Sequence, residues 1–215
     1  MSRTSEISIR CSRCGSLFKA ERYDSVNVSL DPSLKDKVLD GSLFLKECPH
    51  CGSEALIPGN TLYHDQNEKL MVWVTGGDSA LEEQVKKGYE DLLKGYVLRF
   101  VTDSGSLIEK VKILDSGLDD VVMEMCKYVT AMEIAGKMKD READIMAAPF
   151  KFLRMDGADG EITLAYPLDG EMQMVGIGFN VYEDCRGIVK RNPSLKEASS
   201  GFCRIDRDWL NRFVL

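Results

Sequence analysis

The sequence predicts an α+β fold, in which an N-terminal antiparallel β ribbon with an inserted short helix is followed by helices and an antiparallel β region. Three observations predict this fold. Two Cys-x2-Cys pairs lie in the first quarter of the chain, short alternating apolar and polar runs surround them, and the later helical and strand-like patterns are segregated. Segregated patterns are typical of α+β domains rather than of a parallel doubly wound sheet.

Short strands and one short helix are expected around the cysteine pairs. Ile7 and Ile9 alternate with polar residues up to Cys11, which predicts a strand that leads into the first pair. Residues 31–41 predict a helix of two or three turns, because this run starts with Asp-Pro and ends with glycine. Further short strands are predicted within residues 16–22, 25–29, 43–47 and 53–74.

The run Thr75-Gly76-Gly77-Asp78 is the clearest boundary in the chain. It predicts a ribbon domain over residues 1–76 and an α+β C-terminal region over residues 77–215. The next helix is expected to start with the capping box Ser79-x-x-Glu82 and to extend towards Gly95.

The C-terminal region combines helices with an antiparallel sheet. A second capping box, Ser106-x-x-Glu109, predicts the start of a helix, and an apolar stripe predicts a longer helix over residues 118–139. The Asp119–Asp120 pair suits the N-terminus of that longer helix. Strands are predicted over residues 96–101, 151–155, 161–166, 172–180 and 201–205, before a terminal helix that begins at Asp206.

The cysteine pairs have the pattern of a four-thiolate zinc site. Cys11, Cys14, Cys48 and Cys51 can surround one ion tetrahedrally, and a glycine follows each pair. A closed shell of four sulfurs leaves no position for water or substrate, so the expected zinc ion is structural. The interval between the pairs is longer than the roughly 15 to 20 residues of the commonest pattern, and the predicted helix accounts for the excess. A thiol–disulfide redox pair is the main rival, although neither pair has the βαβ context of a thioredoxin-like motif.

Several runs of the sequence resemble the CpXC family of bacteria and archaea. They include Val26-Asn27-Val28-Ser29-Leu30-Asp31-Pro32, Cys48-Pro49-His50-Cys51-Gly52 and Leu62-Tyr63-His64-Asp65, and the likeness extends over roughly residues 7 to 130. The first pair departs from the motif that names the family, because Ser12 and Arg13 stand between its cysteines and proline does not. The resemblance implies a prokaryotic, zinc-ribbon-like protein, and the family has no established biochemical function that it would carry over.

Composition limits the classes of partner. The formal net charge is -7 and the isoelectric point is near 5.0, which disfavours a general nucleic-acid or membrane-surface binder. A local basic cluster leaves a nucleic-acid-binding ribbon as an alternative; it consists of Arg10, Arg13, Lys19 and Arg22.

The N-terminal residues, the length of the apolar runs and the remaining cysteines bear on where in the cell the protein is expected. The N-terminal residues are not those of a signal peptide, and no apolar run approaches the length of a membrane span, so we expect a cytoplasmic protein. In a reducing compartment Cys126, Cys185 and Cys203 are expected to be thiols that pack in the interior.

Catalytic candidates are few. The chain has two histidines, His50 within the second cysteine pair and His64 beside Asp65. Neighbouring residues on a strand point to opposite faces, so adjacency gives no contact between His64 and Asp65. The glycines of Gly176-Ile177-Gly178-Phe179-Asn180 are interpreted as strand residues. We therefore expect a non-catalytic module that binds a protein partner, with an enzyme acting near His64 and Asp65 as a second alternative.

Overall fold

The computed structural model describes residues 2–89, 93–157 and 160–214 of the 215-residue chain. These residues form a mixed α+β structure, which confirms the predicted fold class. The chain divides into two compact units. The first unit contains the residues up to Ile108 together with Gly201–Cys203, and the second contains Glu109–Ser200 and the residues from Arg204 onward.

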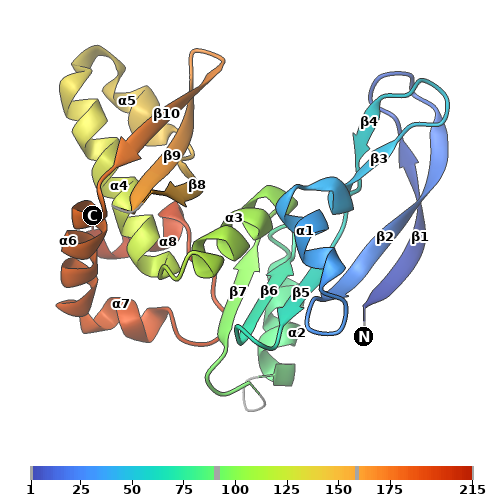
Figure 1. Cartoon of the computed structure of the whole chain (residues 1–215), viewed down its shortest axis with the longest axis horizontal. Coiled ribbons are helices and arrows are strands. Elements are labelled where there is room, and N and C mark those ends of the chain that lie inside the picture. Colours follow the sequence, from blue (N-terminus) through green and yellow to red (C-terminus); the bar gives the residue numbers. More distant parts are fainter. Residues whose placement is uncertain (1, 90–92, 158–159, 215) are drawn as a thin grey trace. The chain divides into compact units, whose positions relative to one another are not determined.

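A five-stranded mixed sheet organises the first unit (Figure 1). In the order of the sheet, its strands are β1 (Arg3–Arg10), β2 (Leu17–Asn27), β5 (Thr61–Asp65), β6 (Leu70–Val74) and β7 (Val97–Val101). Strands β1 and β2 are antiparallel, β2 and β5 are parallel, β5 and β6 are antiparallel, and β6 and β7 are parallel. The two strands predicted over residues 16–29 are thus one continuous strand, because the polar residues between them remain paired with β1.

A separate two-stranded hairpin carries the second cysteine pair. It consists of β3 (Leu45–Glu47) and β4 (Glu54–Leu56), and Figure 1 shows it beside the β1–β2 hairpin. Helix α1 (Ser33–Leu39) lies between the two hairpins in the sequence, as predicted, and it buries Leu34 and Val38. The 3-10 turn η1 (Ser42–Phe44) then leads into β3.

Helix α2 (Ser79–Tyr89) covers one face of the sheet, where Val85 packs with Met71 and Phe100. Its start differs from the predicted capping box, because the Asp78 carboxylate accepts the N–H groups of Ala80 and Leu81. The expected extension towards Gly95 passes through residues 90–92, which lie outside the described part of the chain. The predicted domain division at residue 76 stays a prediction; β7, which follows it, pairs with β6 inside the first compact unit.

Helix α3 (Ser104–Asp115) starts in the first unit and ends in the second. The second unit is built around α4 (Asp120–Lys137), which begins with Asp119 as its N-cap, as predicted. Its other elements are η2 (Lys139–Arg141), α5 (Glu142–Ala147), β8 (Lys151–Asp156), β9 (Glu161–Leu168), β10 (Glu171–Ile177), α6 (Phe179–Lys190), α7 (Pro193–Ala198) and α8 (Arg207–Val214). The three strands form an antiparallel sheet with β9 in the centre.

Two expected strands near the C-terminus differ from the structure. The strand predicted to reach Asn180 ends at Ile177, and Phe179 begins helix α6, so the Gly176-Ile177-Gly178 run lies at a strand-to-helix junction. Helix α6 buries Tyr182 and Cys185, which lie three residues apart on one helix face. The strand predicted over residues 201–205 is a single bridge between Cys203 and Arg99. Among the described helices, none has the length and apolar character needed to cross a membrane.

Candidate metal centre

Each Cys-x2-Cys pair lies in a tight turn at the end of a hairpin, and the two turns have the same backbone hydrogen bonds. The N–H of Cys11 donates to the Ser16 carbonyl, and the N–H of Gly15 donates to the Cys11 carbonyl, both at 2.9 Å. In the second turn Cys48 pairs with Ser53 and Gly52 pairs with Cys48 at the same distances. Both turns are therefore closed by their own backbone.

A glycine follows each pair for a conformational reason. Gly15 has a φ of 74° and Gly52 a φ of 68°, values that residues with a Cβ rarely adopt. A Cβ at Gly15 would have no heavy atom within 4 Å, so a lack of space is not the reason for the glycine there. The turn geometry alone explains why the glycines follow the cysteines.

The structure brings the four cysteines of the sequence prediction into one cluster. The Sγ atoms of Cys11, Cys14, Cys48 and Cys51 all lie within 4.8 Å of one another. Across the two turns, Cys11 Sγ lies 3.7 Å from Cys51 Sγ, and Cys14 Sγ lies 3.7 Å from Cys48 Sγ. A sulfur–sulfur bond is about 2.05 Å long, so these thiols are not disulfides.

The sulfur geometry fits a tetrahedral metal ion. With metal–sulfur bonds of about 2.3 Å, the edge of a four-sulfur tetrahedron is about 3.8 Å, close to both distances across the turns. The donor set and its spacing therefore suit a metal ion held by four thiolates. His50 is not part of the donor cluster. It is exposed in the second turn, and the clustered donor atoms are all sulfurs.

The protonation of the thiols also favours a bound cation. The hydrogen bond with Ser53 lowers the pKa of Cys11 to about 6, whereas burial raises the pKa of Cys48 to about 11. At neutral pH the protein alone would thus keep a proton on Cys48. Four thiolates this close repel one another, and a divalent cation supplies the attraction needed to deprotonate all of them.

Two serines that the sequence analysis overlooked support the sulfurs. Ser53 Oγ lies 3.3 Å from Cys11 Sγ and 3.0 Å from Cys51 Sγ, so one hydroxyl contacts a cysteine of each turn. A hydrogen bond with Ser16 lowers the pKa of Cys14. The signal was present in the sequence, because a Gly-Ser dipeptide follows both cysteine pairs.

The cysteines are part of a very small apolar core. Cys11 and Cys48 are fully buried, and they cluster with Ile9, Phe18, Ala20 and Ala55. Cys14 is exposed and Cys51 is half-buried. So few apolar side chains contribute little burial, which makes the cysteine cluster the main tertiary link between the two hairpins.

Three members of the basic cluster near the first pair have partners within the chain. Arg10 donates to the Gly15 carbonyl at 2.8 Å. Lys19 pairs with Glu6 at 2.5 Å, and Arg22 pairs with Asp24 at 2.6 Å. Neighbouring carboxylates thus partly neutralise this basic surface.

His64 and Asp65 take different environments on β5. Asp65 is buried, where it accepts the N–H groups of Asn67 and Glu68 and pairs with Lys35 at 3.3 Å. His64 Nε2 lies 3.4 Å from Tyr96 Oη, and burial lowers the pKa of His64. The Asp65 carboxylate is therefore occupied by two backbone N–H groups and Lys35. Among the described residues, no hydrogen bond joins it to the His64 ring.

The other cysteines lie apart from the cluster. Cys126 of α4 and Cys185 of α6 are both buried, and the neighbouring Cys185 thiol raises the pKa of Cys126. Cys203 is half-buried, and Arg99 Nη1 approaches its sulfur at 3.4 Å.

The fold and the cluster define an α+β protein with a four-cysteine ribbon that can hold a metal ion. The family model described as CpXC protein matches residues 9–127, from β1 into α4. This stretch is more than half of the chain, and the chain belongs to the CpXC family. No curated protein and no solved structure gives a significant match.

Proposed function

We propose that this CpXC protein is a structural zinc protein whose ribbon is a non-catalytic module for binding a protein partner. The proposed ligands are Cys11, Cys14, Cys48 and Cys51, which would hold one zinc ion. The observation that carries the proposal is the closed four-sulfur cluster, in which every donor belongs to the chain. Such a shell stabilises a fold and leaves no open position for catalysis.

Exposed apolar residues on the second hairpin support a protein partner. Leu45 and Leu56 lie opposite each other on β3 and β4, and 36% and 62% of their surfaces are exposed. Glu47 and Glu54 form a cross-strand pair two residues further along the same face, beyond the pair Lys46 and Ala55, and are also exposed. Two acidic side chains beside two leucines favour a partner with basic and apolar groups and disfavour a nucleic-acid backbone.

Metal analysis tests the first half of the proposal. Inductively coupled plasma mass spectrometry of the purified chain should give one zinc per chain. Tetrahedral four-sulfur sites also bind iron, so an iron content with visible absorption would contradict the assignment to zinc. A Cys48→Ser variant that keeps the metal content and melting temperature of the wild type would refute the ligand set.

Crosslinking tests the second half. The tagged chain, expressed in the cells that encode it, is crosslinked and the captured proteins are identified by mass spectrometry. We expect one protein to be captured by the wild type and by the control Leu30→Ser, whose leucine is 69% exposed elsewhere in the first unit. The double variant Leu45→Ser, Leu56→Ser should lose it.

Fluorescence anisotropy with labelled DNA and RNA covers the nucleic-acid alternative. Binding that weakens steeply with salt, and that Arg13→Gln reduces, would favour a nucleic-acid ribbon instead of the proposed protein partner. Arg13 is an exposed residue of the first turn.

A further inference from the structure

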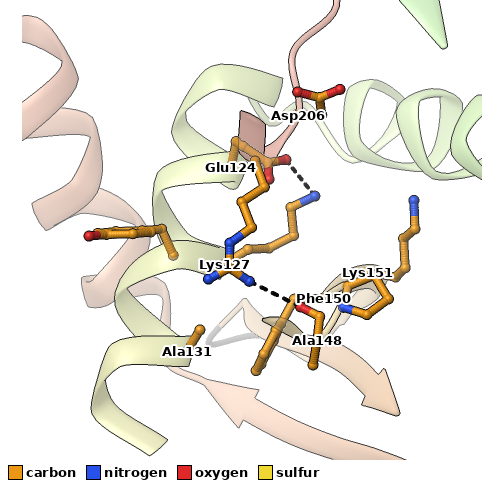
Figure 2. Close-up of a pocket in the computed structure, with 10 residues that line it drawn as sticks. Glu124, Lys127, Ala131, Ala148, Phe150, Lys151 and Asp206 are labelled. Atoms are coloured by element: carbon orange, nitrogen blue, oxygen red, sulfur yellow. Dashed lines mark hydrogen bonds and ion pairs between the residues drawn. The ribbon is translucent and has the colours of Figure 1, made fainter. Parts of the chain in front are cut away.

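A pocket lies within the second unit, which does not contain the four clustered cysteines. A pocket of about 140 Å³ opens between α4, the segment before β8 and the start of α8. Figure 2 shows Glu124 and Lys127 of α4, Lys151 of β8 and Asp206 around it. Pockets for drug-sized ligands have volumes of about 300 to 1,000 Å³, so this pocket suits a small molecule.

Buried ionised groups form one side of the pocket. Lys127 Nζ lies 2.5 Å from Glu124 Oε2 and 3.1 Å from Glu109 Oε1, and the side chains of all three residues are less than a tenth exposed. The second oxygen of Glu109 pairs with Lys151 at 3.0 Å, and Glu109 Oε1 also accepts the N–H of Phe152 at 2.8 Å. Burying three charges is costly, which makes this network a candidate for a functional role.

Two groups of the network, Glu109 and Lys127, are charged at neutral pH. The lysines and the Phe152 N–H hold the pKa of Glu109 at about 2 against the effect of burial. The carboxylates of Glu124 and Glu109 raise the pKa of Lys127 above its usual range, again against burial. Lys127 is therefore a permanent ammonium and not an amine nucleophile.

Arg207 provides hydrogen-bond donors that the protein does not use. Its Nη1 donates to the Ala148 carbonyl at 3.3 Å, and the described residues offer it no carboxylate partner. A guanidinium has five N–H groups and matches a carboxylate with two parallel hydrogen bonds. Arg207 can therefore receive a carboxylate from a ligand.

Carboxylates of the pocket can receive a positive group. Asp206 accepts the N–H of Trp209 through Oδ1 at 2.9 Å, and it has no ion pair among the described residues. Around the pocket, Lys127, Lys151 and Arg207 are thus balanced by the three carboxylates of Glu109, Glu124 and Asp206. A ligand with several negative charges would meet as much repulsion as attraction, so a balanced pocket disfavours phosphate-rich ligands.

The remaining wall is apolar. Phe150 and Pro149 line it, opposite Ala131 and the ring of Tyr128 on α4. The Phe150 ring is stacked on Tyr166 with 4.4 Å between the ring centroids, which fixes its position. The pocket thus combines a carboxylate receptor, ammonium receptors and an apolar surface.

We propose that this pocket binds a small zwitterion with an apolar side chain, such as an α-amino acid. The ligand carboxylate pairs with Arg207, its ammonium group with Asp206 and Glu124, and its side chain packs on Phe150 and Pro149. The site does not depend on the metal centre or on the proposed protein partner.

Isothermal titration calorimetry of the full chain tests the proposal with leucine and phenylalanine as probes. Two analogues of phenylalanine each lack one charge: 3-phenylpropanoate has no ammonium group and 2-phenylethylamine has no carboxylate. We expect binding of an amino acid, and a Kd higher by about tenfold or more for each analogue, because each loses a charged hydrogen bond.

Variants locate the site. Arg207→Gln should weaken amino-acid binding by about tenfold or more, and Asp206→Asn should do the same while its side chain still caps α8. Arg186→Gln is the matched control, because Arg186 is an exposed residue of the same unit that pairs with Glu183 and does not line this pocket. If Arg207→Gln unfolds, as circular dichroism would show, Arg207→Lys replaces it and should still lose the paired hydrogen bonds.

Three results would overturn the proposal. They are the absence of binding by every natural apolar amino acid at millimolar concentration, an analogue with one charge that binds as tightly as the zwitterion, and wild-type affinity in both the Arg207 and the Asp206 variants.

Discussion

The cysteine ribbon and the interior of the second unit both bury groups that carry negative charge, but they obtain the opposite charge from different sources. Around Lys127 the chain places its own ammonium group between two buried carboxylates. Around Cys11 and Cys48 four thiols converge with no cationic side chain among the clustered donors. The second unit therefore supplies the opposite charge from its own side chains, whereas in the ribbon the proposed metal ion would supply it.

Metal removal is expected to have the largest effect and to separate the two regions. Structural zinc in small fingers has an apparent binding free energy of about 10 to 16 kcal/mol, so a chelator or Cys48→Ser should unfold the ribbon. Hydrogen exchange measured by mass spectrometry should show lost protection in β1 to β4 and retained protection in α4. The control is Cys203→Ser, which removes a cysteine outside the cluster. An equal loss of protection in α4 would contradict the proposed difference in metal dependence between the ribbon and the second unit.

The second prediction removes the internal cation. Lys127→Met removes the ammonium group that the buried carboxylates of Glu109 and Glu124 share, so the free energy of unfolding should fall by about 3 to 5 kcal/mol. Urea denaturation followed by circular dichroism measures it. Lys137→Met is the matched control on the same helix, because Lys137 and its partner Glu133 are more than 60% exposed and such pairs contribute at most about 1 kcal/mol. Zinc content should stay unchanged in both variants.

Acid should weaken the second unit through Glu109. Its pKa is lowered from 4.5 to about 2 in the folded state, so its carboxylate stabilises the fold fully above pH 4.5. This contribution is lost as the pH falls from about 4.5 through 2, and a shift of this size corresponds to about 3 kcal/mol. The unfolding free energy of Glu109→Gln should be lower at neutral pH and flatter over this range. A variant curve parallel to that of the wild type would contradict the assignment.

Glycine substitutions are expected to have the smallest effects, with opposite signs in the two regions. Gly52→Ala forces a side chain into a positive φ and should destabilise the ribbon by about 1 to 2 kcal/mol. Gly136→Ala in α4 meets open space in a helix and should stabilise the second unit by about 0.5 to 1 kcal/mol. Thermal melts of the two variants measure both signs. If both melting temperatures shifted in the same direction, backbone conformation would not be what determines the effect of these two substitutions.

Local chemistry made parts of the fold predictable from the sequence. The four-cysteine cluster follows from two turns with the same residue pattern, and α1 follows from its Asp-Pro start and glycine end. The parallel pairing of β2 with β5 is not predictable in this way, because it joins Val26 to Tyr63 across an intervening helix and hairpin. Such long-range pairing depends on the assembled sheet rather than on neighbouring residues.

Buried charged residues are the second feature that could not be predicted from the sequence. Ser106-x-x-Glu109 has the pattern of a capping box, yet Asp103 caps the start of α3 and Glu109 turns inward to Lys127. Asp120 lies in the first turn of α4, as predicted, but it is also buried against Lys110. A sequence gives the spacing of these residues but not the lysines that will face them, so it cannot distinguish a surface carboxylate from a buried one.

The matching hydrogen bonds of the two cysteine turns would have a consequence for the exchange of the proposed metal ion. Because each turn is closed by its own backbone, each can act as a separate two-sulfur chelate, and an ion can leave one turn while the other still holds it. Dissociation of the ion then proceeds through a state in which one turn still binds it and two of its coordination positions are vacant. An incoming thiol chelator can bind at these positions before the second turn dissociates. Exchange should therefore speed up with chelator concentration instead of waiting for spontaneous loss of the ion.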